Sequence, residues 1–135
     1  MTMIAEDLRE SLALGSEWKE EGGSYWTAPE KACPREMAKT VLSHGGRFIT
    51  ITATQLPDED GARLDYHWDV DGSVFTYSFV VKDSGESIYE LCEAANWIER
   101  EIHEYFAIDF IGRKCEPLFL RAGEELGVNL REEDE

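Results

Sequence analysis

Regular alternation of apolar and polar residues in the middle of the chain constrains the fold more than any other feature. One segment interleaves the apolar residues Leu64, Tyr66, Trp68 and Val70 with the polar residues Arg63, Asp65, His67 and Asp69. A period of two predicts a strand that buries one face. Asp71-Gly72 then predicts a tight two-residue hairpin. Beyond it, apolar residues resume at every second position: Phe75, Tyr77, Phe79 and Val81.

A third strand is predicted upstream over residues 47–56, where "RFITITATQL" is rich in threonine and isoleucine. Together the strands form an antiparallel meander whose apolar face is most simply covered by helices. Helical spacing is present over residues 2–14, after Pro34 up to Gly45-Gly46, and over residues 96–106. A stretch around Gly22-Gly23 fits an edge hairpin or a loop.

The sequence therefore predicts one domain over residues 1–135, with a core of about 2–121 and an acidic C-terminal tail of about 122–135. Its class is α+β with two layers, an antiparallel or mixed sheet covered by helices. Residues 88–95 are expected to form a short helix or turn, and residues 107–120 an extended or looping segment.

The charge balance narrows the range of partners. The chain has 29 Asp and Glu against 13 Lys and Arg, a formal net charge of -16. Such a surface repels phosphate backbones and anionic lipid, which makes nucleic acid and bare membrane poor partners and basic protein surfaces better ones. A generally acidic proteome explains the charge equally well. Because no apolar run approaches the roughly 20 residues that span a bilayer, and no secretion signal is evident, we expect a cytoplasmic chain without membrane insertion of its own.

Motifs for catalysis or for cofactors are absent from the sequence. The cysteines, Cys33, Cys92 and Cys115, are widely separated and form no C-x-x-C pair, which argues against a zinc site or an iron–sulfur cluster held by cysteine. Phosphate-binding glycine loops and nucleophile elbows are not found either. His103 is one turn from Glu99, and an exposed helical pair is the simplest account of these two residues.

The helix over residues 96–106, "NWIEREIHEYF", poses a question about one charge. Its apolar residues gather into one arc: Trp97, Ile98, Ile102, Tyr105 and Phe106. Glu101 projects into this arc, whereas Glu99, Arg100, His103 and Glu104 are expected outside it. A carboxylate among core residues needs a partner, so we expect an arginine or backbone donors to anchor Glu101. The alternative is that its head group reaches water at the rim of the core.

The stretch "ANWIEREIHEYFAIDFIG" closely resembles the motif of the 30-kilodalton subunit family of respiratory complex I, which reads approximately A-x-W-x-E-R-E-x-x-D-x-x-G-I-x-F-x-G-H-P. The residues in register are Ala95, Trp97, Glu99, Arg100, Glu101, Ile108, Phe110 and Gly112, and Glu104 stands where the family usually has Asp. The three strands resemble the sheet of the same family, so the resemblance covers roughly residues 36–113.

Two departures from the family pattern stand out. Ala107 replaces a glycine, and Arg113-Lys114 replace the His-Pro pair, after which the expected arginine pair is missing. The chain also ends soon afterwards, which resembles the short form of this subunit in energy-converting [NiFe] hydrogenases and formate hydrogenlyases.

The resemblance implies a structural subunit without cofactors or catalysis of its own, in a membrane-associated oxidoreductase complex. It would dock on the large hydrogenase-like (49-kilodalton-like) subunit, on the cytoplasmic side of the membrane. An energy-converting [NiFe] hydrogenase is the favoured complex, and NADH:quinone oxidoreductase is second. The expected interface and motif positions are Trp97, Glu99, Arg100, Glu101, Glu104, Phe110, Gly112 and Arg113. In this context Glu101 is anchored within the chain or across the interface, and Glu101→Gln is expected to disturb the domain or its assembly.

Two other classes of function stay open at this point. One is a free-standing acidic protein-binding module of the same fold. The other is a small enzyme, which requires a pocket with a perturbed titratable pair.

Overall fold

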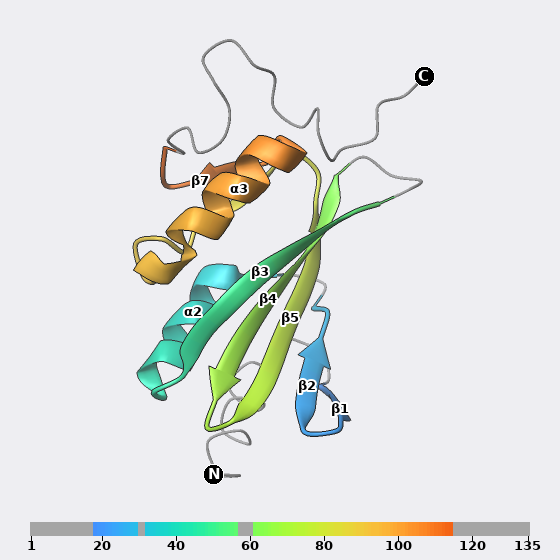
Figure 1. Cartoon of the computed structure of the whole chain (residues 1–135), viewed down its shortest axis with the longest axis vertical. Helices are drawn as coiled ribbons and strands as arrows, with labels where there is room; N and C mark the ends of the chain where they lie inside the picture. The colour runs from blue at the N-terminus through green and yellow to red at the C-terminus, as the bar shows by residue number, and fades with distance from the viewer. Residues whose placement is uncertain (1–17, 30–31, 57–60, 115–135) are drawn as a thin grey trace.

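The structure, a computed structural model, describes residues 18–29, 32–56 and 61–114 (Figure 1). Its elements form a five-stranded sheet in the order β1-β2-β5-β4-β3 and a two-stranded sheet of β6 and β7. The elements are β1 (Lys19–Glu21), β2 (Ser24–Thr27), α2 (Pro34–Ser43), β3 (Arg47–Gln55), β4 (Ala62–Val70), β5 (Ser73–Val81), β6 (Ser84–Glu86), the 3-10 helix η1 (Glu93–Ala95), α3 (Asn96–Phe106) and β7 (Asp109–Ile111). The predicted α+β class is confirmed.

The antiparallel meander predicted from the alternation is present as β3, β4 and β5. Between β4 and β5, Asp71 and Gly72 both have positive φ, 52° and 85°, as a two-residue hairpin with the right-handed strand twist requires. The Asp69 carboxylate accepts a hydrogen bond from the Gly72 amide at 3.1 Å, which supports the turn. The alternating apolar side chains of β4 and β5 lie on one face of the sheet, and all of them are buried except Phe79, which is partly buried.

The stretch around Gly22-Gly23 forms a hairpin, the first of the two predicted alternatives. Its second strand, β2, pairs in parallel with β5, with Ser24 beside Val74 and Thr27 beside Tyr77, so the sheet is mixed. Because β2 ends at Thr27, it covers only the first part of β5.

Both described helices cover the apolar face of the sheet. α2 begins at Pro34, whose missing N–H is not needed in the first turn, and it buries Met37, Ala38 and Val41. α3 packs on β3 and buries Ile102 and Phe106. Figure 1 shows the two helices one above the other on the same side of the sheet. The helix predicted over residues 2–14 and the acidic tail lie outside the described residues.

In the sequence, α3 connects two short strands, β6 and β7, which pair with each other in parallel. η1 leads into α3, as expected for residues 88–95. The helix ends at Phe106, and the next residue, Ala107, has a left-handed φ of 55°. A left-handed residue ends a helix by turning the chain away from the axis. Here the turn carries the chain into β7, so part of the segment predicted to be extended, residues 107–120, is confirmed as a strand.

Candidate functional site

The most completely buried carboxylate of the motif belongs to Glu99, not to Glu101. Glu99 has 0% of its surface exposed. Its Oε1 accepts a hydrogen bond from Ser87 Oγ at 2.7 Å, and its Oε2 accepts one from the Ile88 amide at 2.8 Å. These donors come from the segment that follows β6, so the carboxylate joins α3 to that segment.

Arg113 supplies the counter-charge for Glu99. Its Nη1 lies 3.4 Å from Glu99 Oε1, and its side chain is only 6% exposed. Its Nη2 donates to Asn96 Oδ1 at 2.7 Å, which ties the segment after β7 to the first turn of α3. The guanidinium also lies over the ring of Tyr89, 4.5 Å from the centroid. We call Ser87, Glu99 and Arg113, with Asn96 and Tyr89, the Glu99 cluster.

The surroundings of Glu99 shift the protonation equilibrium of its carboxyl towards the neutral form, relative to a carboxyl in water. Burial raises the pKa of Glu99, and the hydrogen bonds from Ser87 and Ile88, together with the nearby Arg113 charge, lower it only in part. Burial also raises the pKa of the Tyr66 hydroxyl, and the Glu99 and Glu86 charges add to the effect. Glu99 lines neither of the two grooves described below, so its arrangement suits a structural clamp.

The predicted apolar arc of the helix is wrong in two respects: one of its aromatic residues is exposed, and two glutamates expected outside it are buried. Trp97 is 63% exposed, and the Arg100 guanidinium lies 4.9 Å from its ring centroid. Glu99 and Glu104, expected outside the arc, are buried at 0% and 3%. The physical reason, for Glu99, is that the segment after β6 supplies hydrogen-bond donors to its carboxylate. The arc was predicted from the positions of apolar residues alone, which carry no information about such donors.

Glu101 is half-buried and has no hydrogen-bond or ion-pair partner among the described residues. The anchor expected for it within the chain is found at Glu99 instead. The other expectation, a partner across an interface, stays a prediction. The remaining motif residues have structural positions: Phe110 is 3% exposed in β7, and Gly112 has a φ of +104°, which favours glycine.

The histidine pair predicted on the helix is also wrong. His103 does not pair with Glu99, because Glu99 faces the core. His103 Nδ1 instead lies 2.9 Å from the Ile108 carbonyl oxygen and 3.5 Å from Asp109 Oδ1, next to the helix end. These contacts brace the turn into β7. Sequence spacing identifies such a helical pair but not a contact made after the helix has ended.

Within the described part of the chain, no group of three or more His, Cys, Asp or Glu side chains is arranged to hold a metal ion. Cys33 and Cys92 are free thiols, and Cys115 lies outside the described residues. Across residues 18–29, 32–56 and 61–114, the helices are too short or too polar to cross a membrane.

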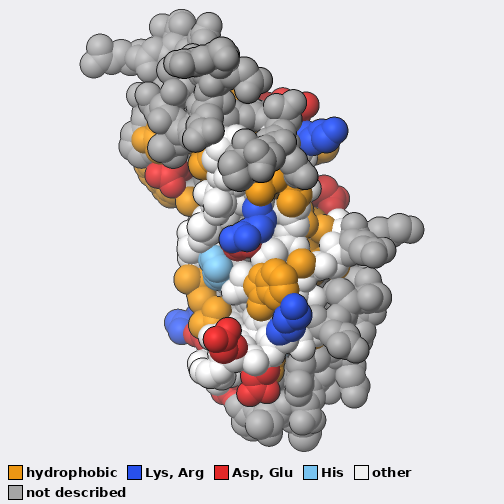
Figure 2. Space-filling view, turned by 90° about the vertical axis from the view of Figure 1, so that its right-hand side faces the viewer, with side chains coloured by type: hydrophobic (Ala, Val, Ile, Leu, Met, Phe, Trp, Pro, Cys, Tyr) orange, Lys and Arg blue, Asp and Glu red, His pale blue; other side chains and the backbone are white. Residues whose placement is uncertain are grey.

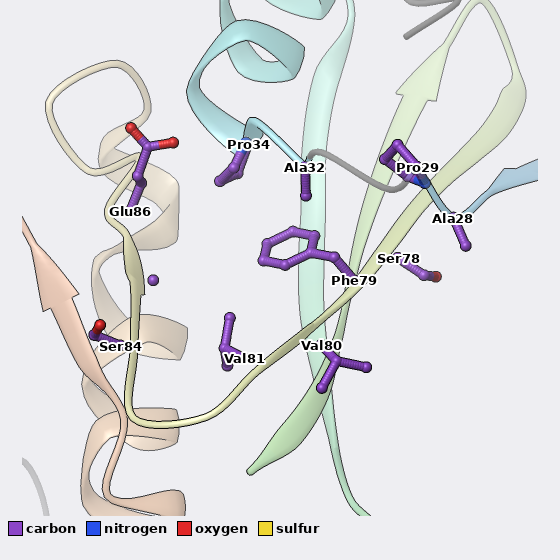
Figure 3. Close-up of a pocket in the computed structure, with 11 residues that line it drawn as sticks. Ala28, Pro29, Ala32, Pro34, Ser78, Phe79, Val80, Val81, Ser84 and Glu86 are labelled. Carbon is purple, nitrogen blue, oxygen red and sulfur yellow. The ribbon is translucent and has the colours of Figure 1, made fainter. Parts of the chain in front are cut away.

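Two grooves are lined by residues that the structure describes. The larger, of about 530 Å³, lies beside the last four residues of β5, 78–81, and is closed by the end of β2, the start of α2 and β6. In Figure 3, Phe79 points into it from the β5 side, while the Glu86 carboxylate points outward at its rim. The second groove, of about 340 Å³, lies between α3 and β3. Figure 2, a side view, shows hydrophobic, basic and acidic side chains interspersed in small groups on the described surface.

The chain matches the model of a known protein family. The model of the family "Respiratory-chain NADH dehydrogenase, 30 Kd subunit" matches residues 30–132. The chain belongs to this family. In this member of the 30 kDa subunit family, Arg113 contacts the buried glutamate Glu99.

A solved structure supports the same fold for this 30 kDa subunit family member. A chain of the membrane-bound sulfane sulfur reductase (MBS), an archaeal respiratory membrane complex, superposes with a TM-score of 0.72 at 20% sequence identity. The match covers 84% of this chain and 71% of that one. No match is found among curated proteins.

Proposed function

We propose that this chain is a non-catalytic structural subunit of a membrane-associated respiratory oxidoreductase complex. It docks on the large hydrogenase-like (49-kilodalton-like) subunit from the cytoplasmic side of the membrane. An energy-converting [NiFe] hydrogenase is the first candidate for the complex, and an NADH:quinone oxidoreductase is the second. The observation that carries the proposal is the family match over residues 30–132, which includes the meander β3-β4-β5 and the motif helix α3.

The geometry of the motif supports a structural role. Glu99 is fully enclosed and held by Ser87, Ile88 and Arg113, so its hydrogen-bonding capacity is used within the chain. A general acid or base has to reach a substrate directly or through one water. A clamp of this kind instead fixes the position of α3, and it leaves the opposite face of the helix, with Trp97 and Glu101, available for a partner.

The fold likeness adds support. The MBS chain that superposes on this one is part of a respiratory membrane complex. The Glu99 cluster holds α3 in a fixed position before any partner binds. A rigid surface of this kind suits permanent assembly, because little conformational entropy is lost when it binds a larger partner.

The test is native affinity purification of the tagged chain from membranes of its own host, followed by mass spectrometry. We expect a large catalytic subunit and membrane subunits in stoichiometric amounts, retained through a high-salt wash that removes adventitious acidic-protein contacts. A hydrogenase-like large subunit names the first candidate complex, and one accompanied by NADH-oxidising subunits names the second. A monomer or homodimer confined to the soluble fraction would overturn the proposal and favour a free-standing binding module. The matched control is the tag alone, expressed at the same level.

A further inference from the structure

The groove between α3 and β3 runs along a free edge of the sheet. It is lined by four consecutive residues of β3, 50–53, and from α3 by Ile98, Glu101, Ile102, Tyr105 and Phe106. Side chains alternate between the two faces of a strand, so a groove that touches four in a row follows the strand's edge. β3 is the outermost strand of its sheet, and no strand within the described residues pairs with its outer edge.

Among the described residues this edge has one of the usual protections, an irregularity of register between Phe48 and Thr50, and the remainder of the strand has none. Exposed edges are normally guarded by charged residues, prolines or very short strands. β3 has nine residues, and the stretch "FITITAT", residues 48–54, contains neither a charge nor a proline. Ile49, within it, is 47% exposed. A strand of this composition is prone to pair with another extended chain, so it requires a cover in its working state.

One wall of the groove carries a charge that the described residues do not neutralise. Glu101 lines the groove and has no hydrogen-bond or ion-pair partner among them. A half-buried carboxylate is best matched by an arginine or a lysine. Trp97 lies one helical turn before Glu101 on the same side of α3 and offers an exposed aromatic ring next to it. The groove therefore combines an open backbone edge, apolar side chains and one acidic group.

We propose that an extended segment of the complex's large subunit binds in this groove, adds a strand to the outer edge of β3 and places an arginine or lysine against Glu101. The inference rests on the proposed function, because the large subunit is the partner assigned there. Strand addition supplies affinity through main-chain hydrogen bonds, and the side-chain pockets supply specificity. A second copy of this chain fits less well, because its net charge of -16 would bring acidic surface to Glu101.

Site-specific photocrosslinking in the host tests the location. A benzophenone amino acid replaces Thr52, which is exposed in β3 and lines the groove. The matched control carries the same group at Val80, which is 53% exposed beside the larger groove. We expect Thr52 to crosslink to one segment of the large subunit that is apolar and contains an arginine or lysine, and Val80 not to do so. A crosslink from Thr52 to a second copy of this chain would overturn the proposal.

Charge reversal tests the chemistry. We expect Glu101→Lys to lower the amount of large subunit recovered per tagged chain by about tenfold or more, and Glu101→Gln to lower it less. The control Glu20→Lys, an exposed position in β1 at the opposite edge, should stay within about twofold of wild type. Recovery of Glu101→Lys at the wild-type level overturns the proposal.

The two proposals fail in different ways. If the unmodified tagged chain recovers no large subunit, the proposed function is wrong and this inference falls with it. If the complex is recovered but position 52 gives no crosslink to the large subunit, only the groove proposal is overturned. The crosslinking result stands even where a Glu101 variant proves unstable, because it uses a different residue.

Discussion

Replacing Arg113 with methionine should destabilise the chain, and more strongly at neutral than at acidic pH. Methionine keeps an unbranched apolar stem but removes the guanidinium. The change eliminates the 3.4 Å contact to Glu99, the 2.7 Å hydrogen bond to Asn96 and the stacking on Tyr89. Glu99 is then a fully buried carboxylate held only by Ser87 and Ile88.

The expected magnitude follows from the geometry. Removing one member of a buried ion pair destabilises proteins by about 3–5 kcal/mol. The long Arg113–Glu99 separation and the two donors that remain place this variant at the lower end, about 3 kcal/mol at pH 7.5. That is a large share of the roughly 5–15 kcal/mol by which a domain is stable.

The pH dependence has a definite sign. The pKa of Glu99 is already raised by burial, and Arg113 is one of the groups that lower it, so the variant raises it further. A group with a raised folded pKa binds protons more readily when folded. Its contribution to the free energy of unfolding is full below the unfolded pKa, about 4.3, and is lost as the pH rises through the folded pKa. The gap between wild type and Arg113→Met should therefore shrink as the pH is lowered towards 5.

Urea unfolding followed by tryptophan fluorescence at pH 5 and pH 7.5 measures this gap. Because a neutral amide at position 99 needs no counter-charge, Glu99→Gln alone should lose about 1 kcal/mol, and the double variant should regain about 2 kcal/mol relative to Arg113→Met. Arg47→Met, which removes an arginine 81% exposed and paired with Asp69, is the control and should change stability by less than about 1 kcal/mol. An equal loss at both pH values together with no rescue by Glu99→Gln would refute the reasoning.

Three further predictions concern single positions. Ala107→Gly should raise the free energy of unfolding by about 0.5–1 kcal/mol, measured by urea unfolding, because Ala107 holds a φ of 55° that glycine adopts without strain. Burial lowers the pKa of His67, with Asp65 opposing, so the stability this group contributes is full above pH of about 6.5 and is lost as the pH falls through the folded pKa. An NMR titration should place that pKa below about 6.5, and a value above it would contradict the assignment. Glu101→Gln should leave the unfolding curve within about 0.5 kcal/mol of wild type, because the side chain has no partner among the described residues; a larger loss would restore an intrachain anchor.

The sheet could be predicted because its signal is local and repeated. Four apolar residues at alternate positions of β4 face the core, and only a strand places them so. The hairpin at Asp71-Gly72 depends on two adjacent residues that accept positive φ, which sequence shows directly. The parallel pairing of β2 with β5 has no such signal, because it joins segments about fifty positions apart, as the 52-residue separation of the Trp26–Ser78 hydrogen bond illustrates.

The contact at the centre of the candidate site could not be predicted from the sequence. The resemblance named Glu99 and Arg113 among the expected interface and motif positions, and the structure shows the two side chains in contact with each other. Periodicity assigned the wrong glutamate to the core. The spacing of apolar residues does not show which carboxylate will receive hydrogen bonds from Ser87 and Ile88. The free edge of β3 could not be predicted for a different reason. Which strand lies at an edge depends on the strand order of the whole sheet, and the sequence of one strand does not show that order.

The Glu99 cluster has a consequence for how the chain folds. Its ties run over short separations: 12 residues from Ser87 to Glu99, 14 from Glu99 to Arg113 and 17 from Asn96 to Arg113. The meander β3-β4-β5 is equally local, since each strand pairs with the next. Low contact order of this kind favours rapid folding, because little loop-closure entropy is lost before contacts form. The segment from β6 to Arg113 is therefore able to close on itself early in folding, and this closure sets the position of the motif helix α3.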